Sequence, residues 1–251
     1  MKLLLQIKNL KIEFPQGRGV SCALSGVDLE IYEGEALVLA GESGSGKSLT
    51  ALSVTKLLPE NARIISGEII FQGKDLLRLN EKELEDVRGR DISYIFQEAS
   101  ASLNPVLTIG SQIAESIILH QHKTKKEAEA LALELLRSVR LPHPGQIFRG
   151  YPHQLSGGMN QRVMIAMALC SLPRLLIADE PTTALDVTIE KEIIRMLLEL
   201  KTRFNFSILF ITHNLALAER LAGRIAIMYQ GRIVEKTHPH ALELAEAVIR
   251  L

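Results

Sequence analysis

The stretch Gly41-Glu42-Ser43-Gly44-Ser45-Gly46-Lys47-Ser48 decides how this chain folds, because it fits the phosphate-binding pattern G-x-x-x-x-G-K-[ST] at every fixed position. Its glycines let the backbone turn tightly and direct several N–H groups into one concavity. Lys47 adds a positive charge, and Ser48 adds a hydroxyl that suits Mg²⁺. The stretch therefore predicts a loop that binds the phosphates of a nucleotide.

The residues on either side of the loop support this prediction. Residues 36–40 are apolar throughout, which is typical of a strand buried on both faces of a parallel sheet. Residues 48–58 have the pattern of a helix, which Pro59 would end. A strand, a glycine loop and a helix in this order point a helix N-terminus at an anion. The alternative, a glycine-rich turn with a chance lysine, leaves both flanking patterns unexplained.

The composition is that of an ordinary globular protein. Of the 251 residues, 47% are hydrophobic and 23% are charged, which allows a large core in one domain or in two joined lobes. The 29 basic residues balance the 29 acidic residues, so there is no net field to attract DNA, RNA or anionic lipid. We therefore expect no nucleic-acid partner.

Cysteine content and hydropathy bear on the compartment. Cys22 and Cys170 are too few and too isolated for a disulfide framework, a zinc site or an iron–sulfur cluster, which favours a reducing cytosol. Residues 1–9 alternate like a strand and lack a small-residue cleavage site, so we expect no signal peptide. No segment approaches the roughly 20 apolar residues that span a bilayer. If the protein serves a membrane, we expect the pore to be another polypeptide.

The remaining apolar patterns predict an α/β protein. Alternation within residues 3–32 predicts an antiparallel strand pair, which would form a small β-lobe with a strand at 66–72. Between residues 98 and 155 the period becomes helical, and this helical insert either packs on itself or contacts a partner. The other expected elements are strands at 92–96, 175–180 and 207–211, helices at 159–172, 188–203 and from 240, and a hairpin at 225–234.

Two consecutive carboxylates, Asp179 and Glu180, stand at the C-terminal end of an apolar strand. This placement is costly unless a cation or a reaction uses them. Asp179 would hold Mg²⁺ through its waters, and Glu180 would orient and activate the water that attacks the γ-phosphate. The alternative is a strand-end pair bound to a nearby arginine or lysine.

Other polar residues follow strands or open a helix. Gln97 follows a strand and either contacts Mg²⁺ or the attacking water, or is a solvated loop residue. His213 also follows a strand and either senses the γ-phosphate or caps the next helix. Ser156 suits a helix N-cap, and Gly157 and Gly158 after it leave backbone N–H groups uncovered.

With these motifs in this order, the chain resembles the ATP-binding subunit of an ABC transporter over nearly every residue. The resemblance implies a P-loop NTPase fold with a parallel core sheet, a small antiparallel β-lobe and a helical subdomain. It implies one domain over 1–251, with the core at 1–97 and 173–251 and the helical subdomain with the signature at 98–172. In the family's terms the motifs are Walker A at 41–48, the Q-loop at Gln97, the signature at 155–161, Walker B at 175–179 with Glu180 as catalytic base, the D-loop at 184–186 and the switch His213.

The resemblance also assigns roles, with ATP and Mg²⁺ as cofactors. It implies catalytic roles for Glu180, His213 and Gln97, and contacts to Mg²⁺ for Ser48, Gln97 and Asp179. Phe14 falls where the family places an aromatic residue that stacks on adenine, and Tyr32 is the alternative. The other implied ATP contacts are Gly41, Glu42, Ser43, Gly44, Ser45, Gly46, Lys47, Ser48, Ser156, Gly157, Gly158 and Asp186.

More narrowly, the sequences at 94–98, 102–105 and 180–188 look like the peptide and nickel importer branch of the family. That branch imports oligopeptides, dipeptides or nickel, using two separate ATPase chains, two membrane subunits and a solute-binding protein. Two features depart from its pattern. Asn160 stands where a basic residue is common, and the chain stops soon after His238-Pro239-His240, where peptide-importer relatives carry a longer tail. The short tail favours a nickel or other short-tailed import subunit.

The resemblance implies that two ATPase subunits, identical or paralogous, sandwich two ATP molecules at the cytoplasmic face of the membrane. A groove between Gln97 and the helical insert would take a helix of the membrane subunit. One rival interpretation is an ATPase of DNA repair or chromosome maintenance, but residues 98–155 hold no long heptad run and no basic patch. The other is a non-catalytic nucleotide-gated scaffold, and the presence of Glu180 and His213 speaks against it.

Overall fold

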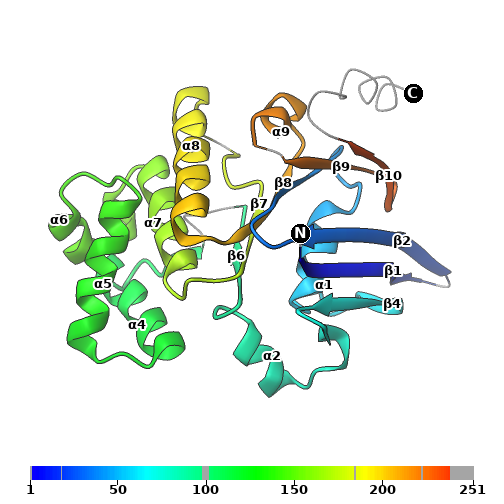
Figure 1. The fold of residues 1–251 in the computed structure, drawn as a ribbon, viewed down its shortest axis with the longest axis horizontal. Helices are drawn as coiled ribbons and strands as arrows, with labels where there is room; N and C mark the ends of the chain where they lie inside the picture. Colours follow the sequence, from blue (N-terminus) through cyan, green and yellow to red (C-terminus); the bar gives the residue numbers. More distant parts are fainter. Residues whose placement is uncertain (1, 18, 98–101, 184, 222, 238–251) are drawn as a thin grey trace. The chain divides into compact units, whose positions relative to one another are not determined.

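The computed structural model describes residues 2–17, 19–97, 102–183, 185–221 and 223–237. The chain divides into two compact units (Figure 1). The first unit comprises residues 1–85 and 207–251, and the second comprises residues 86–206.

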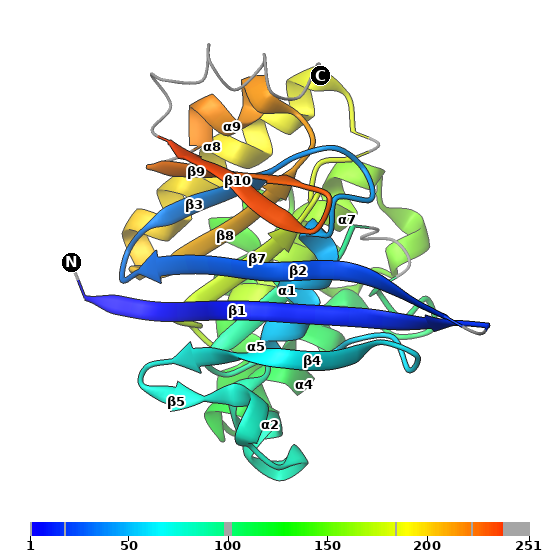
Figure 2. The same cartoon turned by 90° about the vertical axis from the view of Figure 1, so that its right-hand side faces the viewer.

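An antiparallel sheet forms the N-terminal part of the first unit. Its strands are β1 (Leu3–Gln16), β2 (Gly19–Tyr32), β4 (Arg63–Phe71) and β5 (Lys74–Asp75), in the order β2-β1-β4-β5 (Figure 2). Alternating apolar residues are fully buried, Leu5 and Ile7 before a register shift in β1 and Leu10 and Ile12 after it begins, as a sheet with one covered face requires. The expected antiparallel pair and the strand after it are confirmed.

Parallel strands form the other part of the first unit. The strand β3 (Ala36–Ala40) runs parallel to β8 (Ser207–Thr212) on one side and to β9 (Arg224–Tyr229) on the other, and β10 (Arg232–Thr237) returns antiparallel to β9. In this register Ala40 is paired with Thr212 and with Ile227. The segments that follow β3 and β8 therefore leave the sheet at the edge where β9 ends, which brings residues 41, 213 and 228 together.

The first helix is shorter than the sequence predicts. The helix α1 (Lys47–Val54) ends four residues before the expected Leu58. Lys56 has a left-handed backbone with φ 52°, the Leu57 N–H reaches the Leu52 carbonyl at 3.0 Å, and the Lys56 N–H reaches the Ser53 carbonyl at 3.1 Å. These two bonds form the Schellman ending of a helix, so backbone geometry ends α1 before Pro59 can. The first unit also holds the 3₁₀ turn η1 (Leu76–Arg78) and α9 (Leu215–Leu221), and α2 (Glu81–Val87) crosses the boundary between the units.

The second unit combines a parallel strand pair with most of the helices. The strands β6 (Ile92–Ile95) and β7 (Leu175–Asp179) pair in parallel, and every residue of β7 is buried. The helices α4, α5, α6 and α7 pack on one another, and α7 also packs on β6 (Figure 1). The helical elements are α4 (Ile109–Gln121), α5 (Lys125–Ser138), α6 (Pro144–Arg149), the 3₁₀ turn η2 (Pro152–Gln154), α7 (Gly157–Leu169) and α8 (Val187–Phe204).

This unit is larger than the helical subdomain expected at 98–172, because it also takes in β6, β7 and α8. The contact of α7 with β6 accounts for the inclusion of the strand pair. The predicted division into a nucleotide-binding core and a helical subdomain stays a prediction. The expected helix from residue 240 lies outside the described residues. Among the described residues, no helix combines the length and the apolar character that crossing a membrane requires.

Candidate functional site

The phosphate loop follows β3, and its glycines are required by close contacts. Gly41 has φ 151°, and a Cβ added there would lie 2.2 Å from the Met228 carbonyl oxygen. Gly46 has φ 106°, and a Cβ added there would lie 2.6 Å from Leu24 Cδ2 and 2.9 Å from Met228 Cε. At both positions a larger residue would have to displace β2 or β9. The loop is therefore held in one conformation by the strands around it.

The interior of this loop has the chemistry of an anion site. Lys47 is 5% exposed, and its Nζ donates to the carbonyls of Gly41 at 2.8 Å and Glu42 at 2.7 Å. Ser45 Oγ is buried and has no hydrogen-bond partner among the described residues, which is an unusual cost for a folded protein. Gly46 caps α1 without a side-chain bond, so the first amides of the helix face the loop. A phosphate would satisfy both the hydroxyl and these amides.

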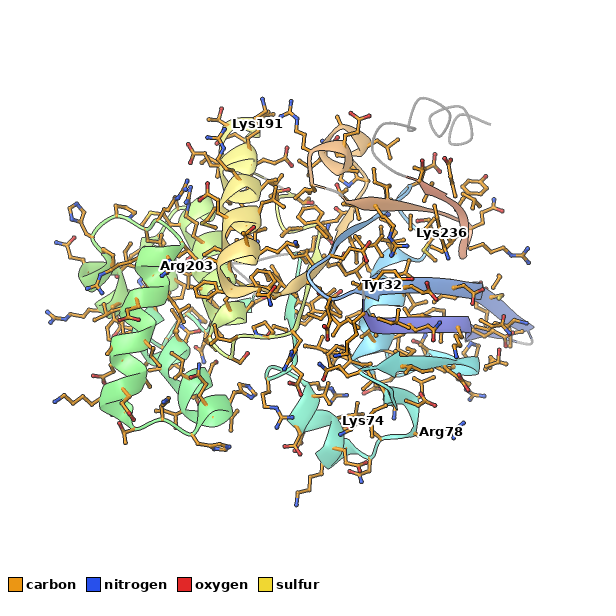
Figure 3. All side chains as sticks on the ribbon, viewed as in Figure 1. Tyr32, Lys74, Arg78, Lys191, Arg203 and Lys236 are labelled. Carbon is orange, nitrogen blue, oxygen red and sulfur yellow. The ribbon has the colours of Figure 1, made fainter. Side chains whose placement is uncertain are left out.

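The other predicted residues of the first unit lie on strands or directly after them. His213 is exposed and follows Thr212, the residue paired with Ala40, so it leaves the sheet beside Gly41. Phe14 lies near the end of β1, where it pairs with Ser21 and is half-buried. Tyr32, at the end of β2, is labelled in Figure 3. It donates to Glu30 at 2.9 Å, and the Arg224 guanidinium lies 5.1 Å from its ring centroid. Since Arg224 already covers one face of Tyr32, Phe14 is the better candidate for stacking on adenine.

Asp179 is a buried carboxylate at the end of β7. It is 7% exposed, and Tyr94 of β6 donates to its Oδ2 at 2.8 Å. A carboxylate oxygen suits Mg²⁺, which is usually held by one or two carboxylates together with substrate phosphates. No cluster of three or more His, Cys, Asp or Glu side chains that could hold a metal occurs within the described parts of the chain. The chemistry of the buried Asp179 carboxylate fits a Mg²⁺ ion that is bound together with ATP.

Glu180 follows directly and has a backbone rarely adopted by a glutamate, with φ 45°. Its Oε2 accepts from Thr183 Oγ1 at 2.9 Å and from Gln97 Nε2 at 3.4 Å. The pairing of Ile95 with Ala178 explains why Gln97 and Glu180 meet, because each lies two residues beyond its strand partner. The second unit thus brings together three of the predicted residues, namely Gln97, Asp179 and Glu180. Strain of this kind is often found where a side chain must be aimed for function.

The signature stretch begins α7 as predicted. Ser156 Oγ caps the helix by accepting from the Met159 N–H at 3.4 Å, and both Ser156 and Gly157 are exposed. Gly158 is buried, and a Cβ added there would lie 2.9 Å from Ile189 Cγ2 of α8. Asp186 caps α8 by accepting from the N–H groups of Thr188 and Ile189 at 3.2 and 3.0 Å. These residues keep the structural roles of helix caps, and their contacts to ATP stay predictions.

Two groups of contacts around the site were missed from the sequence. Tyr94 and Thr183 donate to Asp179 and Glu180, and Met228 and Gly231 pack on the phosphate loop from the β9–β10 hairpin. The Gly231 N–H donates to the Ser45 carbonyl at 2.9 Å. Tyr94 and Thr183 lie in the stretches 94–98 and 180–188, which resemble the importer branch, so their hydroxyls could have been predicted to contact the site. The hairpin contact depends on strand order and has no local signal.

Comparison with known proteins agrees with this geometry. The family model described as ABC transporter matches residues 24–183. A probable peptide ABC transporter ATP-binding protein of Sinorhizobium fredii is 46% identical over 98% of this chain and 77% of its own length. A peptidoglycan transport ATP-binding protein of Agrobacterium fabrum is 51% identical over 92% of this chain, which spans 43% of that relative.

A solved structure is also similar. It is a dimeric ATP-binding cassette in a post-hydrolysis state bound to ADP and Pi, with a TM-score of 0.84 and 29% identity, and the match covers 94% of this chain and 99% of the other. The likeness confirms the expected P-loop NTPase fold. The family model covers more than half of the 251 residues, and the phosphate loop has the predicted geometry. This chain therefore belongs to the ABC transporter family, as one of its ATP-binding domains.

Proposed function

We propose that this chain is the ATP-hydrolysing subunit of an import system. The observation that carries the proposal is Glu180, a carboxylate aimed by a strained backbone and two hydrogen-bond donors, directly after the buried Asp179. A family member that only bound nucleotide would not need a second carboxylate in this position. The general base of ATP hydrolysis does need one, because it must orient a water molecule against the γ-phosphate.

The roles of the chain's own residues follow from their chemistry. The phosphates are bound by Lys47, the amides of the loop and the Ser45 hydroxyl. Glu180 accepts a proton of the attacking water as the water oxygen bonds to the γ-phosphorus and the bond from that phosphorus to the β,γ-bridging oxygen breaks, which leaves ADP and phosphate. Gln97 donates to Glu180 and so helps to orient it. His213, which leaves the sheet beside the phosphate loop, is suited to contact the γ-phosphate. Bound Mg²⁺ would be held by Ser48, Asp179 and Gln97, and would neutralise charge on the phosphates.

The signature serves a neighbouring subunit in this proposal. Ser156 and Gly157 are exposed at the start of a 13-residue helix, and a helix start attracts anions through its amides and its dipole. The phosphate loop already has the start of α1 for this purpose. We therefore assign the start of α7 to ATP held by a second ATPase subunit, identical or paralogous, so that two ATP molecules are sandwiched in a dimer.

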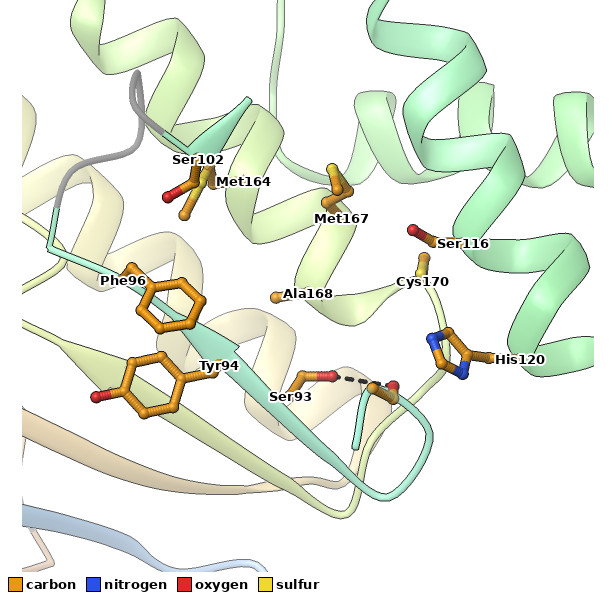
Figure 4. Close-up of a pocket in the computed structure, with 11 residues that line it drawn as sticks. Ser93, Tyr94, Phe96, Ser102, Ser116, His120, Met164, Met167, Ala168 and Cys170 are labelled. Carbon is orange, nitrogen blue, oxygen red and sulfur yellow. Dashed lines mark hydrogen bonds between the residues drawn. The ribbon is translucent and has the colours of Figure 1, made fainter. Parts of the chain in front are cut away.

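A pocket of about 210 Å³ in the second unit is the proposed contact with a membrane-spanning subunit (Figure 4). Phe96, the neighbour of Gln97, is 41% exposed at this pocket. Burial and the charges of Arg90 and His122 lower the pKa of His120, which favours its neutral form. The other lining residues that matter here are Tyr94, Ser116, Met164, Met167 and Cys170.

Burial also raises the pKa of Cys170 to about 12, so its thiol stays protonated and unreactive. The pocket is therefore a neutral packing surface and not a reaction site. An apolar helix of the membrane subunit fits this chemistry. Because the pocket lies next to Gln97, which donates to Glu180, docking of this helix would change the position of Glu180. The chain would then act as a peripheral subunit on the cytoplasmic face of the membrane, with one partner ATPase and two membrane-spanning subunits.

The relatives support peptides as the imported solute. One is named for peptide transport and the other for peptidoglycan transport. We therefore propose uptake of peptides or peptide-bearing solutes, delivered by a solute-binding protein. Neither relative is named for nickel, so the preference for nickel that the short tail suggested has no support. The same names favour transport over DNA maintenance and over a non-catalytic scaffold.

Glu180→Gln tests the proposal, because it keeps the size of the side chain and removes the base. We expect MgATP affinity to stay about the same and turnover to fall by on the order of 10²–10⁴. Turnover is measured by phosphate release, and affinity by titration calorimetry. Glu199→Gln, the same change at an exposed carboxylate of α8, is the control and should leave both quantities unchanged. Turnover of Glu180→Gln within threefold of the parent would remove the base from the mechanism.

A further inference from the structure

Tyr94 is the side chain that connects β6 to Asp179. Its hydroxyl donates to Asp179 Oδ2 at 2.8 Å. Strand register explains the contact, because Tyr94 is paired with Ile177 across the parallel β6–β7 pair, and Asp179 lies two residues further along on the same face. A tyrosine is long enough to reach this next position on the neighbouring strand.

The ring of Tyr94 is held in place, so its hydroxyl is held as well. The centroids of the Tyr94 and Phe96 rings lie 4.4 Å apart, with the ring planes tilted by 32°. Both rings line the pocket in which Met164 also lies (Figure 4). A packed aromatic ring with two side-chain torsions has few alternative positions. The hydrogen bond to Asp179 is therefore set before any ligand binds.

The proton of this hydrogen bond belongs to tyrosine. An ionised carboxylate can only accept a hydrogen bond, whereas a tyrosine hydroxyl can donate one, so Tyr94 is the donor to Asp179. A carboxylate that accepts such a bond is already restricted in orientation, so it loses less conformational entropy when it binds a cation.

We propose that Tyr94 is a positioning residue for metal-linked ATP binding, whose hydroxyl holds the Asp179 carboxylate in the orientation that Mg²⁺ requires. Groups that hydrogen-bond a ligating side chain are worth about 10–100-fold in metal affinity. The inference rests on the proposed role of Asp179 toward Mg²⁺. It assigns no contact between Tyr94 and the nucleotide.

The test compares ATP affinity with and without Mg²⁺ in the full chain by titration calorimetry. The dissociation constant without Mg²⁺ divided by the one with Mg²⁺ measures how strongly the binding of the metal and of the nucleotide are coupled. Tyr94→Phe keeps the ring and removes only the hydroxyl, so we expect this ratio to fall about 10-fold while metal-free ATP affinity stays unchanged. Tyr151→Phe removes a tyrosine hydroxyl from another part of the second unit and should leave the ratio as in the parent.

The double variant Tyr94→Phe with Asp179→Asn separates positioning from general damage. If the hydroxyl acts through the carboxylate, the double variant should lose no more of the ratio than Asp179→Asn alone. A ratio for Tyr94→Phe within twofold of the parent would overturn the proposal, and so would an equal loss of affinity with and without metal.

The test also distinguishes this inference from the proposed ATPase activity. A chain that binds MgATP in the Tyr94-dependent way but releases no phosphate would refute the proposed function and keep the inference. A parent that hydrolyses ATP while Tyr94→Phe keeps the full ratio would do the reverse. If Asp179→Asn also keeps the ratio, both the metal role of Asp179 and the role of Tyr94 are wrong.

Discussion

Two helices of this chain, α1 and α7, have glycines at their N-terminal ends, and they differ in what surrounds their first turn. At the start of α1, Lys47 is buried and strands of the same unit press on Gly41 and Gly46. At the start of α7, Ser156 and Gly157 are exposed, and only Gly158 is covered, by Ile189. The first site is shaped by its own unit, whereas the second presents its amides outward. ATP binding and ATP hydrolysis should therefore be separable by substitutions at the two sites.

The largest effect should come from a negative charge at the exposed start of α7. Gly157→Asp places a carboxylate where we propose the γ-phosphate of a neighbour's ATP to bind. We expect hydrolysis to fall by at least on the order of 10², because like charges repel and the donor site is lost. ATP affinity of the monomer should remain that of the parent, because the phosphate loop is unchanged.

Position 157 is a cleaner test than position 158. The nearest described atom to a Cβ at 157 is Leu185 Cδ2 at 3.8 Å, an ordinary contact, whereas a Cβ at 158 would strike Ile189 at 2.9 Å. Gly145→Asp is the matched control, since Gly145 is an exposed glycine in the first turn of α6 with no described atom within 4 Å of a Cβ. Parent-like phosphate release by Gly157→Asp would show that α7 does not act on a neighbour's ATP.

A smaller effect, on binding itself, should come from the buried lysine of the phosphate loop. Lys47→Ala removes a charge-assisted contact worth roughly 1.5–3 kcal/mol, which corresponds to about 10–150-fold in ATP affinity. Lys56→Ala is a matched control, because the Lys56 ammonium also donates to two carbonyls, those of Leu77 and Leu79, at 3.0 Å each. Titration calorimetry should show weakened binding for the first variant only. Equal affinities for the two variants would take Lys47 out of the site.

The sequence predicts the parts of the site whose chemistry is local. The phosphate loop, the paired carboxylates and the Ser156 cap each lie within a few residues, so their pattern could be read directly. The contacts of Tyr94 with Asp179 and of Met228 with Gly41 join residues that only strand order and register bring together. The same holds for the early end of α1, which depends on the left-handed backbone of Lys56. The helix α4 lies within the predicted helical insert but was not placed individually, although Thr108 caps it and Ile109, Ile113 and Ile117 recur at helical spacing.

The smallest effect should come from the hairpin that supports the phosphate loop without belonging to it. Gly231 has φ 74°, its N–H donates to the Ser45 carbonyl, and a Cβ there would lie 2.4 Å from the Ala23 carbonyl oxygen. Gly231→Ala should therefore shift the hairpin and lower ATP affinity by about fivefold, equivalent to about 1 kcal/mol. Gly73 is the matched control, because it is also a hairpin glycine with positive φ, 81°, but no described atom lies within 4 Å of a Cβ.

Both alanine variants carry the strain of a side chain at positive φ, and Gly231→Ala adds the clash with the Ala23 carbonyl, so it should lose more thermal stability than Gly73→Ala in the absence of nucleotide. Only Gly231→Ala disturbs a contact to the loop, so only this variant should bind ATP more weakly in titration calorimetry. If both variants keep the parent's affinity, the β9–β10 hairpin does not shape the phosphate loop. The difference between the phosphate loop and the start of α7 would then depend on Gly41, Gly46 and Lys47 alone. If both variants lose affinity equally, the cause is backbone strain and not the contact between Gly231 and Ser45. The phosphate loop would then not owe its rigidity to the strands around it.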